Sequence, residues 1–296
     1  MMMSKTSDMI REKFGKTDQK RDEGLQTPKN IFRYDNILYG QDENFQSLDL
    51  YKPKEQKTNK LPVIISVHGG GWVYGDKEKY QYYCMNLAQR GFAVINFSYR
   101  LAPENKFPAA LEDTCLVFHW IIENALNYQL DTKNLFAVGD SAGANILALA
   151  CAMCTNEDYR QEFTFAPPSG FKLKAIALNC GVNVIEQSDE DTFSKNLIED
   201  YLKNTEDCHE LYLVNALNHM NEQFPPTFLM SAKDDYLKFQ MTPVIHKLLE
   251  KNIPFKVRYY CDDQEKLGHV FHLNIRSSAA KICNDEECNF FKFYKK

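Results

Sequence analysis

The stretch LFAVGDSAG at residues 135–143 decides the fold of this chain. Its apolar half predicts a buried strand, and its second half, of the form G-x-S-x-G, predicts a sharp turn into a helix with Ser141 at the apex. Glycine is needed at 139 and 143, because side chains there would collide where strand and helix meet. The turn presents the Ser141 hydroxyl at the helix N-terminus, where the helix dipole favours developing negative charge. A glycine-rich turn with an incidental serine is the alternative, and the rest of the chain decides between them.

A second glycine-rich stretch follows an upstream apolar run, since VIISV at residues 63–67 continues into HGGGW at 68–72. Three successive glycines leave bare backbone N–H groups that can point together at one oxygen, as the oxyanion of an acyl-transfer intermediate requires. We assign these donors to Gly70 and Gly71, with the N–H of Ala142 as the third. A phosphate-binding loop is the alternative, but this stretch has neither G-x-x-x-x-G-K-[ST] nor G-x-G-x-x-G.

Together these motifs resemble those of the hormone-sensitive-lipase-like carboxylesterases of the α/β-hydrolase superfamily. The resemblance covers about residues 31–275 and implies an α/β fold, with a mostly parallel central sheet flanked by helices and a small helical cap. LDLY at 48–51, followed by Pro53, also resembles the early strand of these esterases and of related carbohydrate acetyl esterases. The motifs that carry the resemblance are HGGGW at 68–72, YRLAPE at 99–104, FPAALED at 107–113 and GDSAG at 139–143.

The resemblance implies a catalytic acid later in the chain, because this superfamily orders its catalytic residues Ser, then Asp or Glu, then His. The apolar run at 226–232 is followed by Asp234 and Asp235, at the carboxyl end of an expected strand, where α/β sheets place their chemistry. The family pattern of an acid, one residue and a leucine fits Asp235. Asp234 remains the alternative.

Seven histidines compete for the role of base. The family pattern of histidine, small residue and phenylalanine fits His269, and His272 is the alternative one helical turn away. His68 belongs to the glycine motif and is expected to order that loop. With His269 as base, Ser141 attacks an ester and forms an acyl-enzyme that water then hydrolyses.

The expected substrates are esters with short acyl groups, acetyl to about butyryl, because glycines crowd the oxyanion loop and the cap is short. The likeness to carbohydrate acetyl esterases adds small carbohydrate esters to this class. Trp72 and Tyr74 flank the oxyanion loop and are candidate substrate-binding residues, although packing of the loop against the sheet is an alternative role. An arylformamidase-like amidase would use the same residues, and a ligand-binding relative without catalysis is a third alternative.

Composition is that of an ordinary soluble enzyme, and we expect no cofactor or metal. A chain of 296 residues with 44% hydrophobic content can bury a large core as one domain. The formal net charge of −5 argues against nucleic acid or an anionic membrane surface as a partner. No signal peptide or membrane-spanning segment is evident, and an odd number of cysteines, nine, indicates reduced thiols in the cytoplasm. The expected partner is a small-molecule ester, and a homo-oligomer is left open.

Strand-like and helix-like runs alternate along residues 31–260, as expected for a largely parallel sheet, and we expect one catalytic domain over residues 31–296. Two segments stand outside this alternation. Residues 1–30 are polar and charged, and they form an N-terminal arm that either joins the cap or is disordered. Residues 181–224 separate two expected strands and are too long for a simple connection, so we expect a helical cap insertion there.

Overall fold

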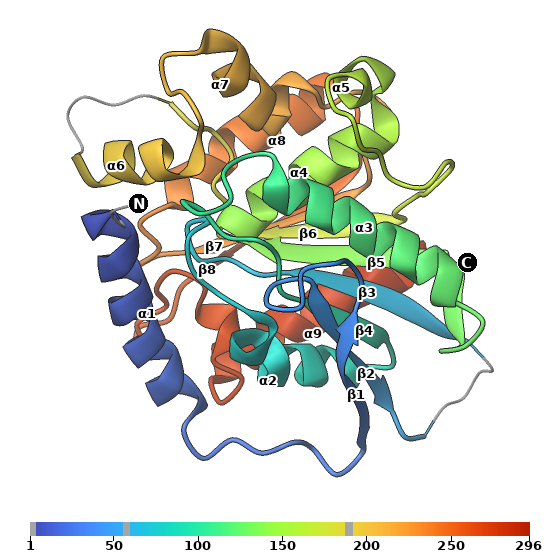
Figure 1. Cartoon of the computed structure of the whole chain (residues 1–296). Coiled ribbons are helices and arrows are strands. Elements are labelled where there is room, and N and C mark those ends of the chain that lie inside the picture. The colour runs from blue at the N-terminus through green and yellow to red at the C-terminus, as the bar shows by residue number, and fades with distance from the viewer. Residues whose placement is uncertain (1–3, 56–59, 187–191) are drawn as a thin grey trace.

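The computed structural model describes residues 4–55, 60–186 and 192–296 of the chain. Within these residues, eight strands form one sheet in the order β1-β2-β4-β3-β5-β6-β7-β8. β2 pairs antiparallel with β1 and with β4, and every other neighbouring pair is parallel. The expected α/β fold with a mostly parallel sheet is thus confirmed (Figure 1). The strands are β1 (Ile31–Leu38), β2 (Ser47–Pro53), β3 (Leu61–Val67), β4 (Ala93–Phe97), β5 (Leu130–Asp140), β6 (Ala175–Asn179), β7 (Thr227–Ala232) and β8 (Phe255–Tyr260).

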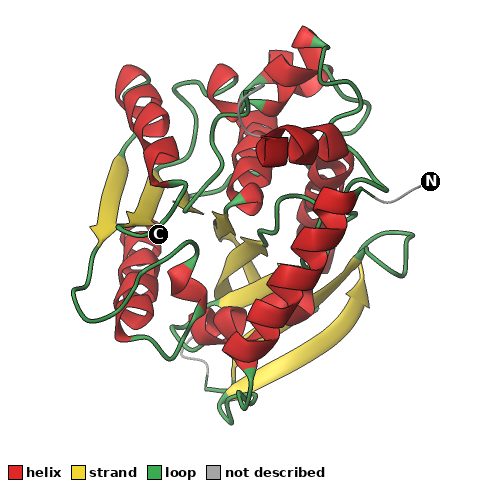
Figure 2. Cartoon of the chain, turned by 90° about the vertical axis from the view of Figure 1, so that its left-hand side faces the viewer, coloured by secondary structure: helices red, strands yellow, loops and turns green. Residues whose placement is uncertain are grey.

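Helices cover both faces of this sheet (Figure 2). α3, α4 and α8 lie on one face, and α2 and α9 lie on the other (Figure 1). Each face buries its own apolar cluster, as shown by Phe291 of α9, whose ring stacks on Phe136 of β5 with centroids 5.1 Å apart. The α-helices are α1 (Lys5–Asp22), α2 (Lys77–Ala88), α3 (Ala109–Asn124), α4 (Ala142–Thr155), α5 (Glu157–Gln161), α6 (Thr192–Tyr201), α7 (Cys208–Val214), α8 (Met241–Glu250) and α9 (Ser278–Tyr294).

The carboxyl ends of four parallel strands position the candidate site. The HGGGW loop follows β3, the GDSAG turn ends β5, Asp235 follows β7 and the loop that carries His269 follows β8. β3 is buried along its whole length, as its continuous apolar sequence predicts for a parallel strand covered on both faces. Because parallel strands end at one edge of the sheet, these four loops meet there.

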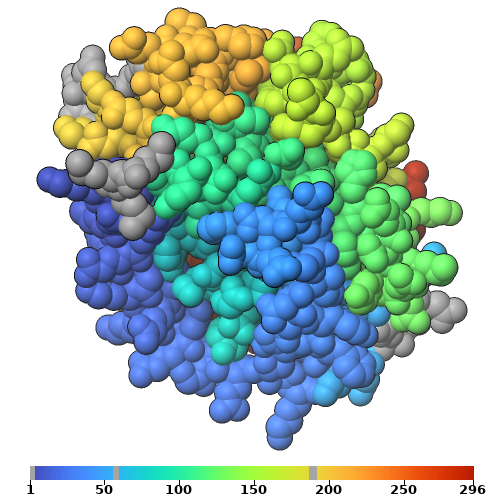
Figure 3. Space-filling model, in the orientation of Figure 1, coloured from blue at the N-terminus to red at the C-terminus, as the bar shows by residue number. Residues whose placement is uncertain are grey.

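The N-terminal arm is helical over α1, which packs at the same edge of the sheet. Arg11 of α1 donates to the carbonyl oxygens of Val73 and Ala102, at 2.9 and 3.0 Å. Ser7 donates to the carboxylate of Asp200 in α6, and α1 and α6 therefore lie side by side, dark blue against yellow in Figure 3. These contacts tie the arm to the loop after β3 and to the insertion.

The expected cap segment at 181–224 contains α6, α7 and a short 3-10 helix (Ala216–Asn218). Residues 187–191 of this segment and residues 1–3 of the arm lie outside the described residues. The part of the insertion that the structure describes folds as helices, in keeping with the amphipathic runs of its sequence.

Candidate active site

Ser141 occupies the turn between β5 and α4 with φ 51° and ψ −121°, a conformation that L-residues rarely adopt. An added Cβ on Gly139 would lie 2.5 Å from the carbonyl oxygen of Gly143, and one on Gly143 would overlap the carbonyl oxygen of Val67. Only glycine fits at these two positions. The Ser141 N–H donates to the carbonyl oxygen of Asn179 at 3.0 Å, which holds the turn against the end of β6.

Ser141, His269 and Asp235 form one chain of hydrogen bonds. His269 Nε2 lies 3.0 Å from Ser141 Oγ, and His269 Nδ1 lies 2.8 Å from Asp235 Oδ1. Asp235 is buried, whereas Asp234 is exposed and its backbone bridges to Gly268. We assign the proton to Nδ1, because a carboxylate can only accept. Nε2 is then free to accept the Ser141 hydroxyl proton.

Asp235 is held in its ionised form. Ser231 donates to its Oδ2 at 2.7 Å, and the Leu237 N–H donates to its Oδ1 at 2.9 Å. Burial alone would raise the pKa of Asp235, but the hydrogen bond and charge of His269, together with these two donors, lower this pKa to about 2. A carboxylate that stays charged at neutral pH can fix the orientation of the imidazole and stabilise its protonated form.

His272, the alternative base, lies in a different environment. It is completely buried, and its ring meets the ring of Tyr83 edge-on with centroids 5.2 Å apart. Neither ring nitrogen has a hydrogen-bond partner among the described residues. Burial lowers the pKa of His272 to about 3, so the ring is neutral at physiological pH. Of the two candidates, His269 is the one that the structure places beside Ser141.

The loop after β3 lines the same cavities as Ser141, and it carries backbone N–H groups that no described residue accepts. Gly70 and Gly71 have φ values of 122° and 61°, which favour glycine, and a Cβ on Gly70 would overlap the carbonyl oxygen of Tyr74. Within the described part of the chain, neither of these two N–H groups donates a hydrogen bond. Ala142 begins α4, and the first N–H groups of a helix have no partner inside it. All three groups are available to an oxyanion.

A tyrosine that the sequence motifs do not single out fastens this loop to the turn. The Tyr80 hydroxyl accepts from the Gly69 N–H at 2.9 Å and donates to Asp140 Oδ2 at 2.7 Å. The ring of His68, which precedes Gly69, stacks on Tyr99 with centroids 4.0 Å apart. Gly69 precedes the candidate oxyanion glycines and Asp140 precedes the nucleophile, so one hydroxyl sets the distance between the two loops.

Two carboxyl groups near the nucleophile are buried, those of Asp140 in the turn itself and of Glu287 in α9. Glu287 accepts from Asn179 Nδ2 at 2.6 Å and from the Tyr83 hydroxyl at 3.1 Å. Burial raises the pKa of each carboxyl to about 7, even though its hydrogen-bond donors act in the opposite direction. Between the ordinary and the raised pKa, the folded chain binds more protons than the unfolded chain. Stability therefore falls as the pH rises through this range.

Glu287→Gln tests this linkage. The free energy of unfolding of the unmodified protein is expected to fall as the pH rises from about 4.5, the ordinary pKa of glutamate, to about 7. The side chain of the variant stays neutral and keeps an acceptor for Asn179. Over the same pH range, the free energy of unfolding of the variant should therefore fall by about 3 kcal/mol less than that of the unmodified protein. Urea unfolding at several pH values measures the difference. Asp285→Asn, on the exposed side of the same helix, is the control, and identical profiles for Glu287→Gln and the parent would contradict the linkage.

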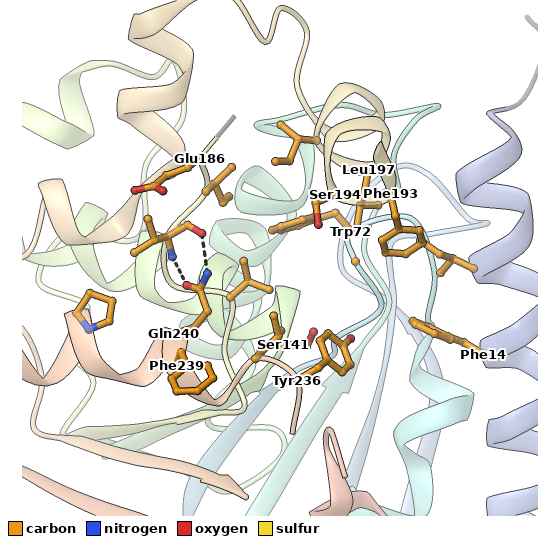
Figure 4. A pocket seen from close by; sticks show the side chains of 18 residues that line it. Phe14, Trp72, Ser141, Glu186, Phe193, Ser194, Leu197, Tyr236, Phe239 and Gln240 are labelled. Atoms are coloured by element: carbon orange, nitrogen blue, oxygen red, sulfur yellow. Dashed lines mark hydrogen bonds between the residues drawn. The ribbon is translucent and has the colours of Figure 1, made fainter. Parts of the chain in front are cut away.

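A cavity of about 590 Å³, hereafter the larger cavity, opens over Ser141. This volume lies in the usual range for small-molecule sites and exceeds what an acetyl group needs. In Figure 4, Ser141 and Tyr236 lie on one side of the cavity, and Trp72 and Ser194 lie on the other. Most of its walls are apolar, with contributions from Ile10, Phe14, Trp72, Val182, Leu197 and Ile198.

A second cavity of about 210 Å³, hereafter the smaller cavity, meets the larger one at Ser141. His269 lines the smaller cavity and is not among the described residues that line the larger one. Most of its wall is apolar, but several polar side chains contribute to it. They come mostly from α1, through Lys13, Thr17 and Asp18, and from Tyr74 in the loop after β3.

Trp72 and Tyr74 each face one cavity and also pack the loop. Trp72 lines the larger cavity, and its ring stacks on Tyr201 of α6 with centroids 4.4 Å apart. Tyr74 lines the smaller cavity and donates to Asp18 of α1 at 2.9 Å. Sequence reasoning left open whether the N-terminal arm joins the cap and named none of its residues as wall residues, because its polar composition conceals the apolar pair Ile10 and Phe14. Their spacing of four residues, which puts them on one helix face, is the signal that was available.

One group of side chains that could hold a metal ion is present in the described residues, and it overlaps the hydrogen-bonded chain. It consists of Cys180, Asp235 and His269, whose ligand atoms lie within 4.8 Å of one another. Both nitrogens of His269 already face Asp235 and Ser141, so neither of them is left for a metal ion. No helix in the described residues has the length and apolar content needed to cross a membrane.

Comparisons with known proteins find esterases. The model of the BD-FAE family matches residues 48–249, more than half of the chain. Versiconal hemiacetal acetate esterase of Dothistroma septosporum is 29% identical over 230 residues, which cover 71% of this chain and 67% of that protein. Ethyl acetate hydrolase of Pseudomonas putida is 35% identical over 102 residues, which cover 34% of this chain and 32% of that protein.

Solved structures share the fold at low sequence identity. Esterase B from Lactobacillus Rhamnosis superposes with a TM-score of 0.88 at 21% identity, covering 98% of this chain and 95% of that chain. A bacterial heroin esterase superposes with a TM-score of 0.77 at 19% identity, covering 97% of this chain and 91% of that chain. At these identities the likeness concerns the architecture, and it extends over nearly the whole chain.

Proposed function

Because the chain belongs to the BD-FAE family and is a carboxylic ester hydrolase of the α/β-hydrolase superfamily, we propose that it is a serine esterase that works through Ser141, His269 and Asp235. The observation that carries the proposal is the chain of hydrogen bonds from Ser141 through His269 to Asp235, at 3.0 and 2.8 Å. Such a chain activates a serine hydroxyl, which is a weak nucleophile on its own.

In the first step, His269 Nε2 accepts the Ser141 proton as Oγ bonds to the ester carbonyl carbon. The carbonyl electron pair moves onto oxygen, where the N–H groups of Gly70, Gly71 and Ala142 stabilise the charge. The ester C–O bond then breaks, and the alcohol leaves with the proton from His269. A water molecule, deprotonated by the same histidine, attacks the acyl-enzyme, releases the carboxylic acid and restores Ser141. Asp235 stays ionised throughout.

The substrates proposed are short-chain acyl esters, with acetyl esters among them. The names of two relatives, versiconal hemiacetal acetate esterase and ethyl acetate hydrolase, both refer to an acetyl ester. Small carbohydrate esters are included, because polar side chains of α1 line the cavity beside His269. We place this activity in the cytoplasm, in keeping with nine free cysteines.

We further propose that α1 and the insertion at 181–224 form the cap over the catalytic domain. The support for this division is that both contribute to the walls of the larger cavity, through Phe14 on α1 and Leu197 on α6. The hydrogen bond between Ser7 and Asp200 joins the two parts of this cap.

Activity on matched esters and amides tests the proposed function. The purified protein is expected to hydrolyse p-nitrophenyl acetate and p-nitrophenyl butyrate with a much higher kcat/KM than N-formylaniline. The reason is that an arylamine is a poorer leaving group than an alcohol or phenol. Preference for N-formylaniline would favour an arylformamidase-like amidase. A folded protein that cleaves none of the three would contradict catalysis and favour a ligand-binding protein.

A further inference from the structure

Cys180 is a buried cysteine that the proposed mechanism does not use. It directly follows β6 and is 1% exposed. Its Sγ lies within 4.8 Å of a carboxylate oxygen of Asp235 and of a ring nitrogen of His269. Cys180 is not among the described residues that line either cavity. Its side chain therefore meets the acid and the base from behind, on the side away from the substrate.

The backbone of Cys180 has a conformation that a residue with a side chain rarely adopts. Its φ is 46°, and Ser141 and Val270 share this left-handed region with φ values of 51° and 52°. Val270 is β-branched, for which a positive φ is a genuine outlier. All three residues belong to, or directly follow, the segments that carry the hydrogen-bonded chain. Such strain persists only where the surrounding structure requires it, and it gathers at functional sites.

Backbone hydrogen bonds on both sides of Cys180 tie its segment to the nucleophile. The carbonyl oxygen of Asn179 accepts from the Ser141 N–H at 3.0 Å, and the Val182 N–H donates to the carbonyl oxygen of Ser141 at 3.1 Å. The Cys180 N–H donates to the carbonyl oxygen of Met230 in β7 at 2.8 Å. The segment thus lies between the nucleophile turn and the strand that leads to the acid.

Asp235 has acceptor capacity left for one more donor. Its Oδ1 accepts from His269 at 2.8 Å and from the Leu237 N–H at 2.9 Å. Among the described residues, Oδ2 accepts from Ser231 at 2.7 Å. A carboxylate has about four acceptor positions, two on each oxygen, so Oδ2 can accept once more. The side chain of Asp235 has no exposed surface, so bulk water does not reach it, and the thiol of Cys180 is the neighbouring group that can donate.

The Cys180 thiol is in a state to donate. Burial and the charge of Asp235 raise the pKa of the thiol, whereas a hydrogen bond from the Val270 backbone acts in the opposite direction. The thiol is therefore protonated at neutral pH. Met230 Sδ lies 3.9 Å from Sγ, but a thioether is a weak acceptor and a carboxylate a strong one.

We propose that Cys180 is a positioning residue that acts through Asp235: its thiol donates to Oδ2 while its sulfur accepts from the Val270 N–H, which joins the loop of the acid to the loop of the base. This inference rests on the proposed function and adds a fourth residue to its machinery. The sulfur forms no bond with the substrate. It restrains the carboxylate, which in turn orients His269 for acceptance of the Ser141 proton.

Cys180→Ala removes the sulfur and keeps the Cβ, so the backbone conformation is unaffected. Its kcat on p-nitrophenyl acetate is expected to fall by roughly tenfold with KM unchanged, because the lost hydrogen bond acts on the acid and not on the cavities. Cys180→Ser replaces the donor and should restore kcat to within about threefold of the unmodified protein. Cys115→Ala is the matched control and should leave kcat unchanged, since Cys115 is a buried cysteine of α3 whose Sγ also lies beside a methionine sulfur, at 3.8 Å.

A double-mutant cycle shows whether Cys180 acts through the acid. In an Asp235→Asn background, Cys180→Ala is expected to lower the acylation rate by less than about twofold, because the carboxylate that the thiol restrains is already gone. Losses that multiply would mean that the sulfur supports the fold in general, and the inference would be wrong. It is equally wrong if Cys180→Ala keeps full kcat, if it raises KM instead, or if Cys180→Ser is as impaired as Cys180→Ala.

The contact between His269 and Asp235 can also be followed without turnover. The proton on His269 Nδ1 is expected to give a downfield proton NMR signal, which Cys180→Ala broadens through faster exchange with water and Cys115→Ala leaves unchanged. An unchanged signal in Cys180→Ala would contradict the inference. If Cys180→Ala does not fold, Cys180→Gly removes the same sulfur and adopts a φ of 46° without strain. A folded, unmodified protein that cleaves no ester would refute the proposed function instead, and the NMR signal would still test the role of the thiol.

Discussion

Ser141→Ala is expected to lower kcat on p-nitrophenyl acetate by roughly 10⁵- to 10⁶-fold. The variant loses the atom that forms the acyl-enzyme, and neither His269 nor the oxyanion groups can replace it. The fold should persist, because the Ser141 N–H and carbonyl oxygen bond to Asn179 and Val182 through the backbone, which alanine retains. Initial rates and the thermal unfolding midpoint, measured on the same sample, separate the two effects.

A reagent that bonds covalently to activated serines gives a second readout. An organophosphate should add one label to the unmodified protein and none to Ser141→Ala, as followed by mass spectrometry. Ser169→Ala, at an exposed serine in the loop before β6, is the control and should retain activity and labelling. Substantial turnover by Ser141→Ala would rule out the acyl-enzyme mechanism.

Asp235→Asn is expected to lower kcat by about 10⁴-fold with little change in structure. An asparagine amide can donate to His269 Nδ1, which would move the ring proton to Nε2, where it blocks acceptance from Ser141. Asp235→Glu keeps a carboxylate at this position, so its kcat should lie between those of Asp235→Asn and the unmodified protein if a carboxylate oxygen reaches His269 Nδ1. The pH dependence of kcat/KM, measured from pH 5 to 9, reports whether the base still titrates.

Asp234→Asn is the matched control, since it makes the same chemical change one residue away. Its side chain is exposed, whereas Asp235 accepts hydrogen bonds from Ser231, Leu237 and His269. We expect Asp234→Asn to keep at least most of the activity. If this variant loses activity and Asp235→Asn does not, the acid has been assigned to the wrong neighbour.

Local motifs made the strand-to-turn segments predictable. The turn at Ser141 and the glycine loop at Gly70 each depend on residues within a few positions of one another, so their sequences specify their shapes. The order of strands and helices from β1 to β8 also follows from the alternation of apolar runs. In each of these cases the information lies within one short segment.

Other features of the structure depend on contacts between segments that are far apart in the sequence, and no local sequence pattern indicates such contacts. The sequence pattern does not indicate α9, because the buried face of this helix includes the polar residues Asn284 and Glu287 and so lacks a continuous apolar stripe. The Tyr80 bridge joins Gly69 to Asp140 across the sheet edge, and it exists only once three segments have packed. The same holds for the cavities, whose walls come from α1, α6 and loops far apart in sequence.

One helix carries wall residues for both cavities, and this has a consequence for enzyme engineering. α1 supplies Ile10 to the larger cavity, Lys13 and Thr17 to the smaller one, and Phe14 to both. The candidate acyl-transfer residues all lie elsewhere, on loops at the ends of β3, β5, β7 and β8. A combinatorial library of substitutions confined to the exposed positions of α1 is expected to yield variants with different ester preferences. The candidate acyl-transfer residues would be the same in every variant. Substitutions in this one helix would therefore change part of the wall of each cavity and leave the candidate acyl-transfer residues in place.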